Sequence, residues 1–281
     1  IDLHGARLAT APMDQNAGGP AISVRVHQQS PDTVRVAFSL SAFDQVTVTP
    51  QADGVTVVVT NCTLSDAPRS GTGTFGSIVT AALTPAASPT QYVPTNPKLI
   101  AIDPGHGGSD PGTVRNGTSE KTLTLDMARR LRDILVARGW QVVMTRTDDR
   151  DVFASGDSAR DELQARDDIA NSRGARLFVS IHVNSYTNAG PHGATTYYYK
   201  SSDVTLAQAL SARIGSELDL KNNGIIKDKL YVVNHAMMPA ALVETAYLSN
   251  PDDLALLLSS AWRQKMAQAI ADGIADYTEN N

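Results

Sequence analysis

The 281-residue chain contains a single cysteine, Cys62, and no long hydrophobic run. One cysteine excludes a disulfide within the chain and any zinc site built from paired cysteines. A metal ion would therefore be bound by His, Asp or Glu side chains. Because no apolar stretch approaches the roughly 20 residues that cross a bilayer as a helix, the sequence predicts no membrane span.

Basic charge is also scarce. The chain has 24 Lys and Arg against 29 Asp and Glu, which gives a net charge of −5, and no segment gathers the basic residues. Nucleic-acid binding usually requires a basic patch, so nucleic acid is not an expected partner. Since the chain starts with Ile1 rather than Met, we expect a processed or truncated product whose secretion signal, if any, preceded it.

Residues 1–61 predict a small all-β domain. Short segments typical of strands follow one another without helical periodicity, at residues 22–27, 33–38, 46–49 and 54–60. Residues 62–96 are rich in Ser, Thr, Gly, Pro and Ala and predict a linker, although the sequence allows one more strand over residues 75–83.

Strands and helices alternate over residues 97–281. The predicted strands are residues 99–102, 140–144, 176–181, 193–199 and 240–244, and the predicted helices are residues 119–138, 161–172, 203–218 and 262–277. Ser119 is placed to cap the first helix and Gly139 to follow its end. This alternation predicts an α/β domain with a mixed or mostly parallel twisted sheet flanked by helices.

Four side chains at the expected ends of these elements are candidates for metal chemistry. His106 lies on a glycine-rich turn after the first strand of this region, Glu120 lies in the first turn of a helix, and His182 and Glu244 end two further strands. In open α/β sheets the carboxyl ends of the strands bind ligands. Two imidazoles and a carboxylate form a catalytic zinc set with an open fourth position, and another carboxylate can be the general base.

The spacing permits this convergence without requiring it. Glu120 can instead complement the dipole of its helix, and His182 can be a hydrogen-bonded histidine of the core. Glu244 directly follows an apolar strand, and a partly buried carboxylate there requires a partner or a function.

Four motifs in this half of the chain, taken together, resemble one family. They are Ile102-Asp-Pro-Gly-His-Gly-Gly-Ser-Asp-Pro-Gly112, Glu120-Lys121, Ser180-Ile-His-Val-Asn184 and Pro239-Ala-Ala-Leu-Val-Glu-Thr-Ala-Tyr-Leu-Ser-Asn250. In this order they resemble the AmiC-like catalytic domain of the zinc-dependent N-acetylmuramoyl-L-alanine amidases of bacterial cell walls. Arg146 and Arg166 also occupy positions typical of the family.

The resemblance implies a role for each site residue. His106, Glu120 and His182 would bind Zn²⁺, which would polarise the scissile carbonyl and activate a water molecule. Glu244 would accept the proton of that water and pass it to the leaving amine. Asp103 would orient His106, and Asn184 would do the same or contact the substrate.

The implied reaction is hydrolysis of the amide bond between N-acetylmuramic acid and L-alanine in peptidoglycan. Stem peptides would be released during wall remodelling or daughter-cell separation, in the cell envelope, by a periplasmic or secreted enzyme. Two alternatives remain: another zinc hydrolase on the same scaffold, or a wall-binding module whose catalytic domain has lost activity.

Two further expectations follow from family resemblance. Residues 2–6, 22–26 and 30–38 resemble the later part of an AMIN domain, which implies that the N-terminal domain binds peptidoglycan, the alternative being a β spacer without a ligand. Autoinhibited amidases carry a long insertion after the strand that matches residues 193–199. Here Lys200-Ser-Ser-Asp203 leads directly into the next helix, so we expect that no activator protein is required.

Overall fold

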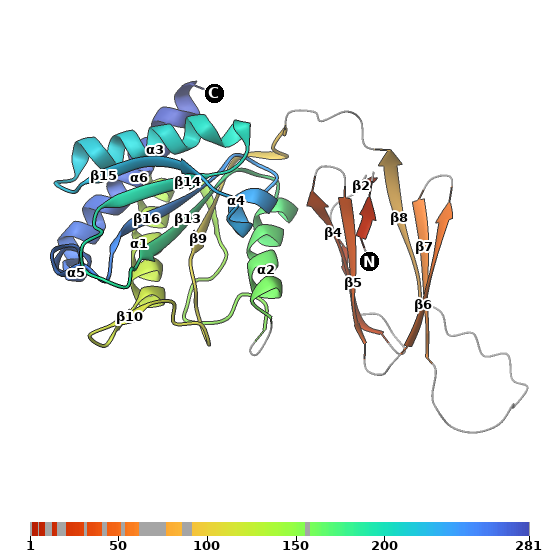
Figure 1. The fold of residues 1–281 in the computed structure, drawn as a ribbon. Coiled ribbons are helices and arrows are strands. Elements are labelled where there is room, and N and C mark those ends of the chain that lie inside the picture. The colour runs from red at the N-terminus through yellow and green to blue at the C-terminus, as the bar shows by residue number, and fades with distance from the viewer. Residues whose placement is uncertain are drawn as a thin grey trace, which may run out of the picture. The chain divides into compact units, whose positions relative to one another are not determined.

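The computed structural model divides the chain into two units, Ile1–Gln91 and Tyr92–Asn281. Side chains are described for residues 92–154 and 158–279, and elsewhere the description covers only the backbone of residue 280 and of the strands before residue 92. In the first unit (Figure 1) these strands are β1 (Asp2–His4), β2 (Ala6–Leu8), β3 (Met13–Gln15), β4 (Ala21–Ser30), β5 (Thr33–Leu40), β6 (Asp44–Gln51), β7 (Gly54–Asn61) and β8 (Ser77–Pro85).

The strands of the first unit pair antiparallel, in the orders β1-β5-β4-β3 and β2-β8-β7-β6. β8 lies in the stretch for which the sequence allows one more strand. The small all-β domain, the linker over residues 62–96 and their boundaries stay predictions, as does the resemblance to an AMIN domain.

The second unit is built on a six-stranded sheet in the order β12-β9-β13-β16-β14-β15 (Figure 1). Its strands are β9 (Asn96–Pro104), β12 (Gln141–Met144), β13 (Ala175–Asn184), β14 (Ala194–Tyr198), β15 (Asn222–Lys227) and β16 (Ala240–Tyr247). Neighbouring strands are parallel except β14 and β16, which are antiparallel. The predicted mixed, mostly parallel sheet is confirmed.

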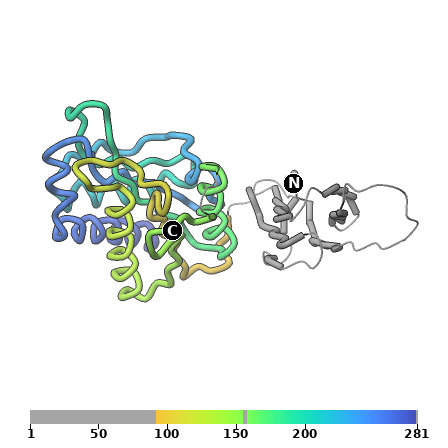
Figure 2. The backbone as a smooth tube through the Cα atoms, turned by 90° about the horizontal axis from the view of Figure 1, so that it is seen from below, coloured from red at the N-terminus to blue at the C-terminus, as the bar shows by residue number. Residues whose placement is uncertain are grey.

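Helices cover both faces of this sheet, as the prediction requires. The helices of the unit are α1 (Glu120–Ala137), α2 (Ala159–Ser172), α3 (Val204–Glu217), α4 (Tyr231–His235), α5 (Pro251–Leu258) and α6 (Ser260–Asn280). Helices α1, α3 and α6 pack over one face and enclose the larger apolar core, whereas α2 and α4 cover the other face and a smaller core. In Figure 2, α1 is yellow-green, α2 green and α6 blue.

The start of α1 differs from the sequence prediction in one respect. Ser119 occupies the N-cap position, but its hydroxyl lies 2.9 Å from the Thr122 hydroxyl and caps no backbone amide. The preceding loop provides the acceptor instead, because Glu120 N donates to Thr113 O at 2.8 Å. The predicted side-chain cap is therefore wrong. At the other end of α1, Gly139 has φ +84° and its amide donates to Val136 O, as expected of a residue that ends a helix.

Some elements were not predicted. They are β15, α4, α5, the 3₁₀ turn η1 (Ser201–Asp203), and the hairpin of β10 (Val114–Arg115) and β11 (Thr118–Ser119). β13 continues to Asn184 and β16 to Tyr247. Both strands thus extend beyond their predicted ends at residues 181 and 244, and His182 and Glu244 lie inside them. Within the described residues, no helix has both the length and the apolar character needed to cross a membrane.

Candidate metal centre

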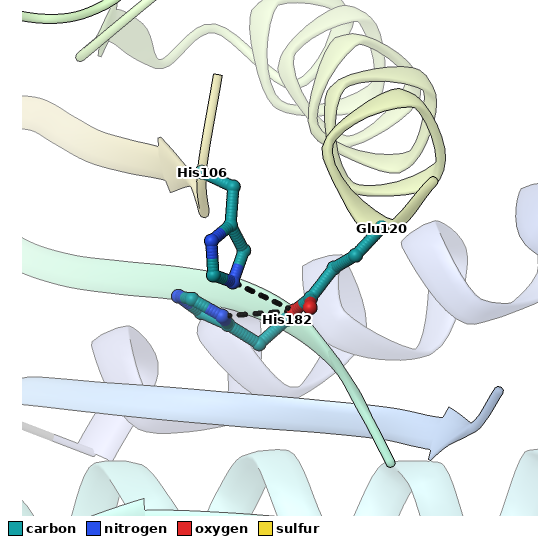
Figure 3. Close-up of side chains that lie close together, drawn as sticks. All are labelled: His106, Glu120 and His182. Atoms are coloured by element: carbon teal, nitrogen blue, oxygen red, sulfur yellow. Dashed lines mark hydrogen bonds and ion pairs between the residues drawn. The ribbon is translucent and has the colours of Figure 1, made fainter. Parts of the chain in front are cut away.

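Three of the predicted side chains meet at the carboxyl edge of the sheet (Figure 3). His106 follows β9, Glu120 begins α1, and His182 lies near the end of β13. His106 Nε2 lies 3.2 Å and His182 Nδ1 3.1 Å from the same atom, Glu120 Oε1. One potential ligand atom from each residue lies within 4.8 Å of the others. The three side chains can therefore bind one metal ion.

The turn that carries His106 requires unusual backbone conformations. His106 has φ +59°, which is uncommon for a residue with a side chain. Glycine at the preceding position leaves room for the imidazole ring of His182, because a Cβ on Gly105 would collide with this ring and displace it. The close approach of this turn to β13 brings the two imidazoles together, with ring centroids 4.9 Å apart and planes at 74°.

The Glu120 side chain is buried and hydrogen-bonded, although it lies in the first turn of a helix. Only 4% of the residue is exposed, and its carboxylate accepts hydrogen bonds from Val183 N at 2.9 Å and Thr113 N at 3.0 Å. Burial alone would raise the pKa of Glu120, but the hydrogen bonds from His106 and His182 outweigh it and hold the pKa well below its usual range. An ionised, oriented carboxylate is what a metal ligand requires.

His106 has a partner that the sequence analysis missed. Its second ring nitrogen, Nδ1, lies 2.6 Å from Asp110 Oδ2. Burial would lower the pKa of His106, but Glu120 and then Asp110 raise it to about 9. A carboxylate on the far nitrogen of a ligating histidine fixes the ring and its tautomer. Asp110 was missed because its only signal is a spacing of four residues within an irregular turn.

Glu244 lies beside the cluster but is not part of it. It is directly opposite His182 in the register of β13 and β16, so both side chains emerge on the same face of the sheet. Glu244 Oε2 is buried and has no hydrogen-bond partner among the described residues. Burial raises the pKa of Glu244 to about 7, against the opposing effect of His182. This carboxylate is therefore suited to accept a proton close to neutral pH.

Asp103 is fully buried but does not orient His106 through a hydrogen bond. Its carboxylate accepts from the Thr145 hydroxyl at 2.6 Å, the Ser180 hydroxyl at 2.7 Å and Arg166 Nη1 at 2.8 Å. The direct contact to the His106 ring is made by Asp110, whereas Asp103 is linked to His106 through Arg166, which also donates to His106 O. The orienting role of Asp103 therefore stays a prediction. Burial alone would raise the pKa of Asp103, but Arg166 and the two hydroxyls lower it.

Asn184 lies two residues beyond His182 on β13. Its side chain is half-buried, and its Oδ1 accepts from Ser185 N at 2.8 Å. The backbone carbonyl of Asn184 accepts from Leu248 N at 2.7 Å, which ties β13 to the end of β16. The role of Asn184 towards ligand or substrate stays a prediction.

A cavity of about 350 Å³ opens beside the two imidazoles. It is lined by His106, Ser109, Asp110, Asp151, Ala154, Ala159, Glu162, Leu163, Arg166 and His182. Both polar and apolar groups of a substrate can therefore lie next to the cluster, as is usual in a ligand site.

Comparison with known proteins gives a consistent result. Residues 100–276 match the protein family described as N-acetylmuramoyl-L-alanine amidase. LytC of Bacillus subtilis, named an N-acetylmuramoyl-L-alanine amidase, is 36% identical over 184 residues, which are 64% of this chain and 35% of LytC. The chain thus spans about a third of the length of that relative.

Two solved structures show the same fold for the second unit. The catalytic domain of CwlV, an amidase of Bacillus (Paenibacillus) polymyxa, has 34% identity and a TM-score of 0.60, covering 66% of this chain and 99% of that chain. The CwlD amidase of Clostridioides difficile, solved in complex with the GerS lipoprotein, has 31% identity and a TM-score of 0.62, covering 66% of this chain and 100% of that chain.

Proposed function

Because this chain belongs to the N-acetylmuramoyl-L-alanine amidase family, we propose that it hydrolyses the amide bond between N-acetylmuramic acid and L-alanine in peptidoglycan and that it does so with zinc. The observation that carries the proposal is the convergence of His106, Glu120 and His182. Two imidazoles and one carboxylate are the donors of many catalytic zinc sites. When bound, the ion supplies Lewis-acid chemistry, which polarises a carbonyl and lowers the pKa of water.

The donor atoms already point at a common position. Each imidazole directs one nitrogen to the same carboxylate oxygen of Glu120, and Asp110 fixes the far side of His106. Glu244 stands next to His182, and its buried Oε2 has no hydrogen-bond partner in the part of the chain that the structure describes. In the proposed reaction Glu244 takes the proton of the attacking water and delivers it to the leaving amine of L-alanine.

The proposed biological role is release of stem peptides during wall remodelling or daughter-cell separation, in the cell envelope. The N-terminal unit would bind peptidoglycan as AMIN domains do. The acidic net charge of the chain and the absence of a spanning helix from the described residues are compatible with this setting.

Digestion of purified peptidoglycan tests the reaction directly. We expect mass spectrometry to find glycan with a free lactyl carboxylate and peptides that begin at L-alanine. Chelation of the metal should stop product formation, and stoichiometric zinc should restore it. Cleavage inside the peptide, or loss of an acyl group, would show that the chain is a different hydrolase on this scaffold. Intact peptidoglycan in the presence of zinc would support a binding module instead.

We also propose that hydrolysis needs no activator protein. After β14 the chain enters the single turn η1 and then α3, so this connection contains no helix that could cover the metal centre. We expect the purified chain to digest peptidoglycan at the same rate with and without an extract of the cell envelope, measured as release of soluble muropeptide. A strict requirement for the extract would contradict this prediction.

A further inference from the structure

Two buried arginines, Arg146 and Arg166, donate hydrogen bonds to the backbone of the turn that carries His106. Arg146 Nε donates to Pro104 O at 3.1 Å, and Arg146 Nη2 donates to Gly105 O at 2.9 Å. Arg166 donates to Pro104 O and to His106 O, both at 2.9 Å. The three successive carbonyls of this turn therefore all accept hydrogen bonds from guanidinium groups.

Arg146 also reaches the first turns of α1, where Glu120 lies. Its Nη2 donates to Lys121 O at 2.9 Å and lies 3.2 Å from the Thr124 hydroxyl. That hydroxyl donates to Gly105 O at 2.8 Å and so links the same two segments. Arg146 is thus bonded both to the turn that carries one candidate ligand and to the helix that carries another.

Burying the charged guanidinium of Arg146 at this position costs free energy. Arg146 has no exposed surface, and burial, with the nearby charge of Arg166, lowers the pKa of Arg146 to about 10. The turn itself contains a strained residue, since His106 has φ +59°. Such strain persists only where the surroundings determine the conformation, most often at functional sites.

We propose that Arg146 is a positioning residue of the metal centre, which fixes the His106 imidazole relative to the Glu120 carboxylate and thereby sets the affinity for the ion. The inference rests on the proposed zinc site. A planar fork of donors can bond two segments at once, whereas the ammonium group of lysine donates from a single point. Charge alone therefore cannot replace the guanidinium here.

The test is the zinc affinity of Arg146→Lys, measured on the full metal-free chain by competition with a chromogenic chelator. We expect binding to weaken by about 10–100-fold, the range found when groups that orient metal ligands are removed. Arg138→Lys is the matched control, because Arg138 pairs with Asp272 on the surface at 2.5 Å and does not touch the site. The control should keep the affinity of the parent chain.

Thermal unfolding of the same metal-free proteins separates positioning from a merely structural role. Unchanged zinc affinity in Arg146→Lys, with or without a lower Tm, would overturn the inference. A parent chain that binds no zinc would instead overturn the proposed metal centre itself.

Thr124 provides the second variant if Arg146→Lys does not fold. Thr124→Val keeps the shape of the side chain but removes the hydroxyl that bonds to Gly105 O and lies next to Arg146, whereas Thr124→Ser keeps the hydroxyl. We expect weaker zinc binding in the valine variant and parental binding in the serine variant. Equal affinities in the two variants would contradict the proposed link between the turn and α1.

Discussion

Replacing Glu244 with glutamine is expected to slow amide hydrolysis by about 10²–10⁴-fold, the usual contribution of general acid–base catalysis, while zinc remains bound. Glu244 lies opposite His182 on the neighbouring strand but is not one of the three clustered candidate ligands. Glutamine has the same shape and cannot accept the proton of the attacking water. The substitution therefore removes the base and leaves the ligand set intact.

Two measurements on one preparation check this result: turnover on purified peptidoglycan and zinc content per chain. Glu217→Gln is a matched control, since Glu217 ends α3 and pairs with Arg213 at 3.1 Å on the surface. The control should have the turnover of the parent chain. Near-parental turnover by Glu244→Gln would remove Glu244 from the mechanism. Loss of zinc by that variant would mean that Glu244 helps to hold the ion.

Much of the fold was predictable because the apolar residues of its core strands and helices follow a regular pattern in the sequence. In β13, Leu177, Val179 and Ile181 face the larger core, while Phe178 on the other face lies in the smaller core. A strand that is buried on both faces appears in the sequence as a nearly continuous apolar run. β15 was missed for the opposite reason, since it is an edge strand whose Asn-Asn-Gly start is typical of a turn.

The sequence allowed the convergence of the candidate ligands without requiring it, and it did not indicate the side chains that hold them. Parallel strands bring His106 and His182 to the same edge of the sheet, but this also requires β9 and β13 to be neighbours, which sequence order alone does not determine. The contacts of Asp110 and Arg146 arise in an irregular turn with positive φ values, for which no periodicity exists. A fully buried arginine in particular contradicts the usual preference of charged residues for the surface.

The metal centre is tested most directly by removing an imidazole, and the backbone of His106 allows an unusually clean experiment. His106→Ala should lose stoichiometric zinc and, with it, hydrolysis, because only one imidazole and one carboxylate would remain. The affinity should fall by more than the roughly 10–100-fold that loss of an orienting partner costs. Alanine, however, keeps the strain of φ +59°, so a loss of zinc could be ascribed to poor folding.

His106→Gly removes this ambiguity, because glycine adopts positive φ values at no steric cost. The metal-free glycine variant should therefore unfold at a temperature no lower than the alanine variant, yet both should fail to retain zinc in equilibrium dialysis followed by metal analysis. His192→Ala is the control for loss of an imidazole, since His192 lies outside the cluster and bonds to Gly190 O. If the glycine variant kept zinc and turnover, His106 would not be a ligand, and the hydrolase would have to work from a different set of side chains.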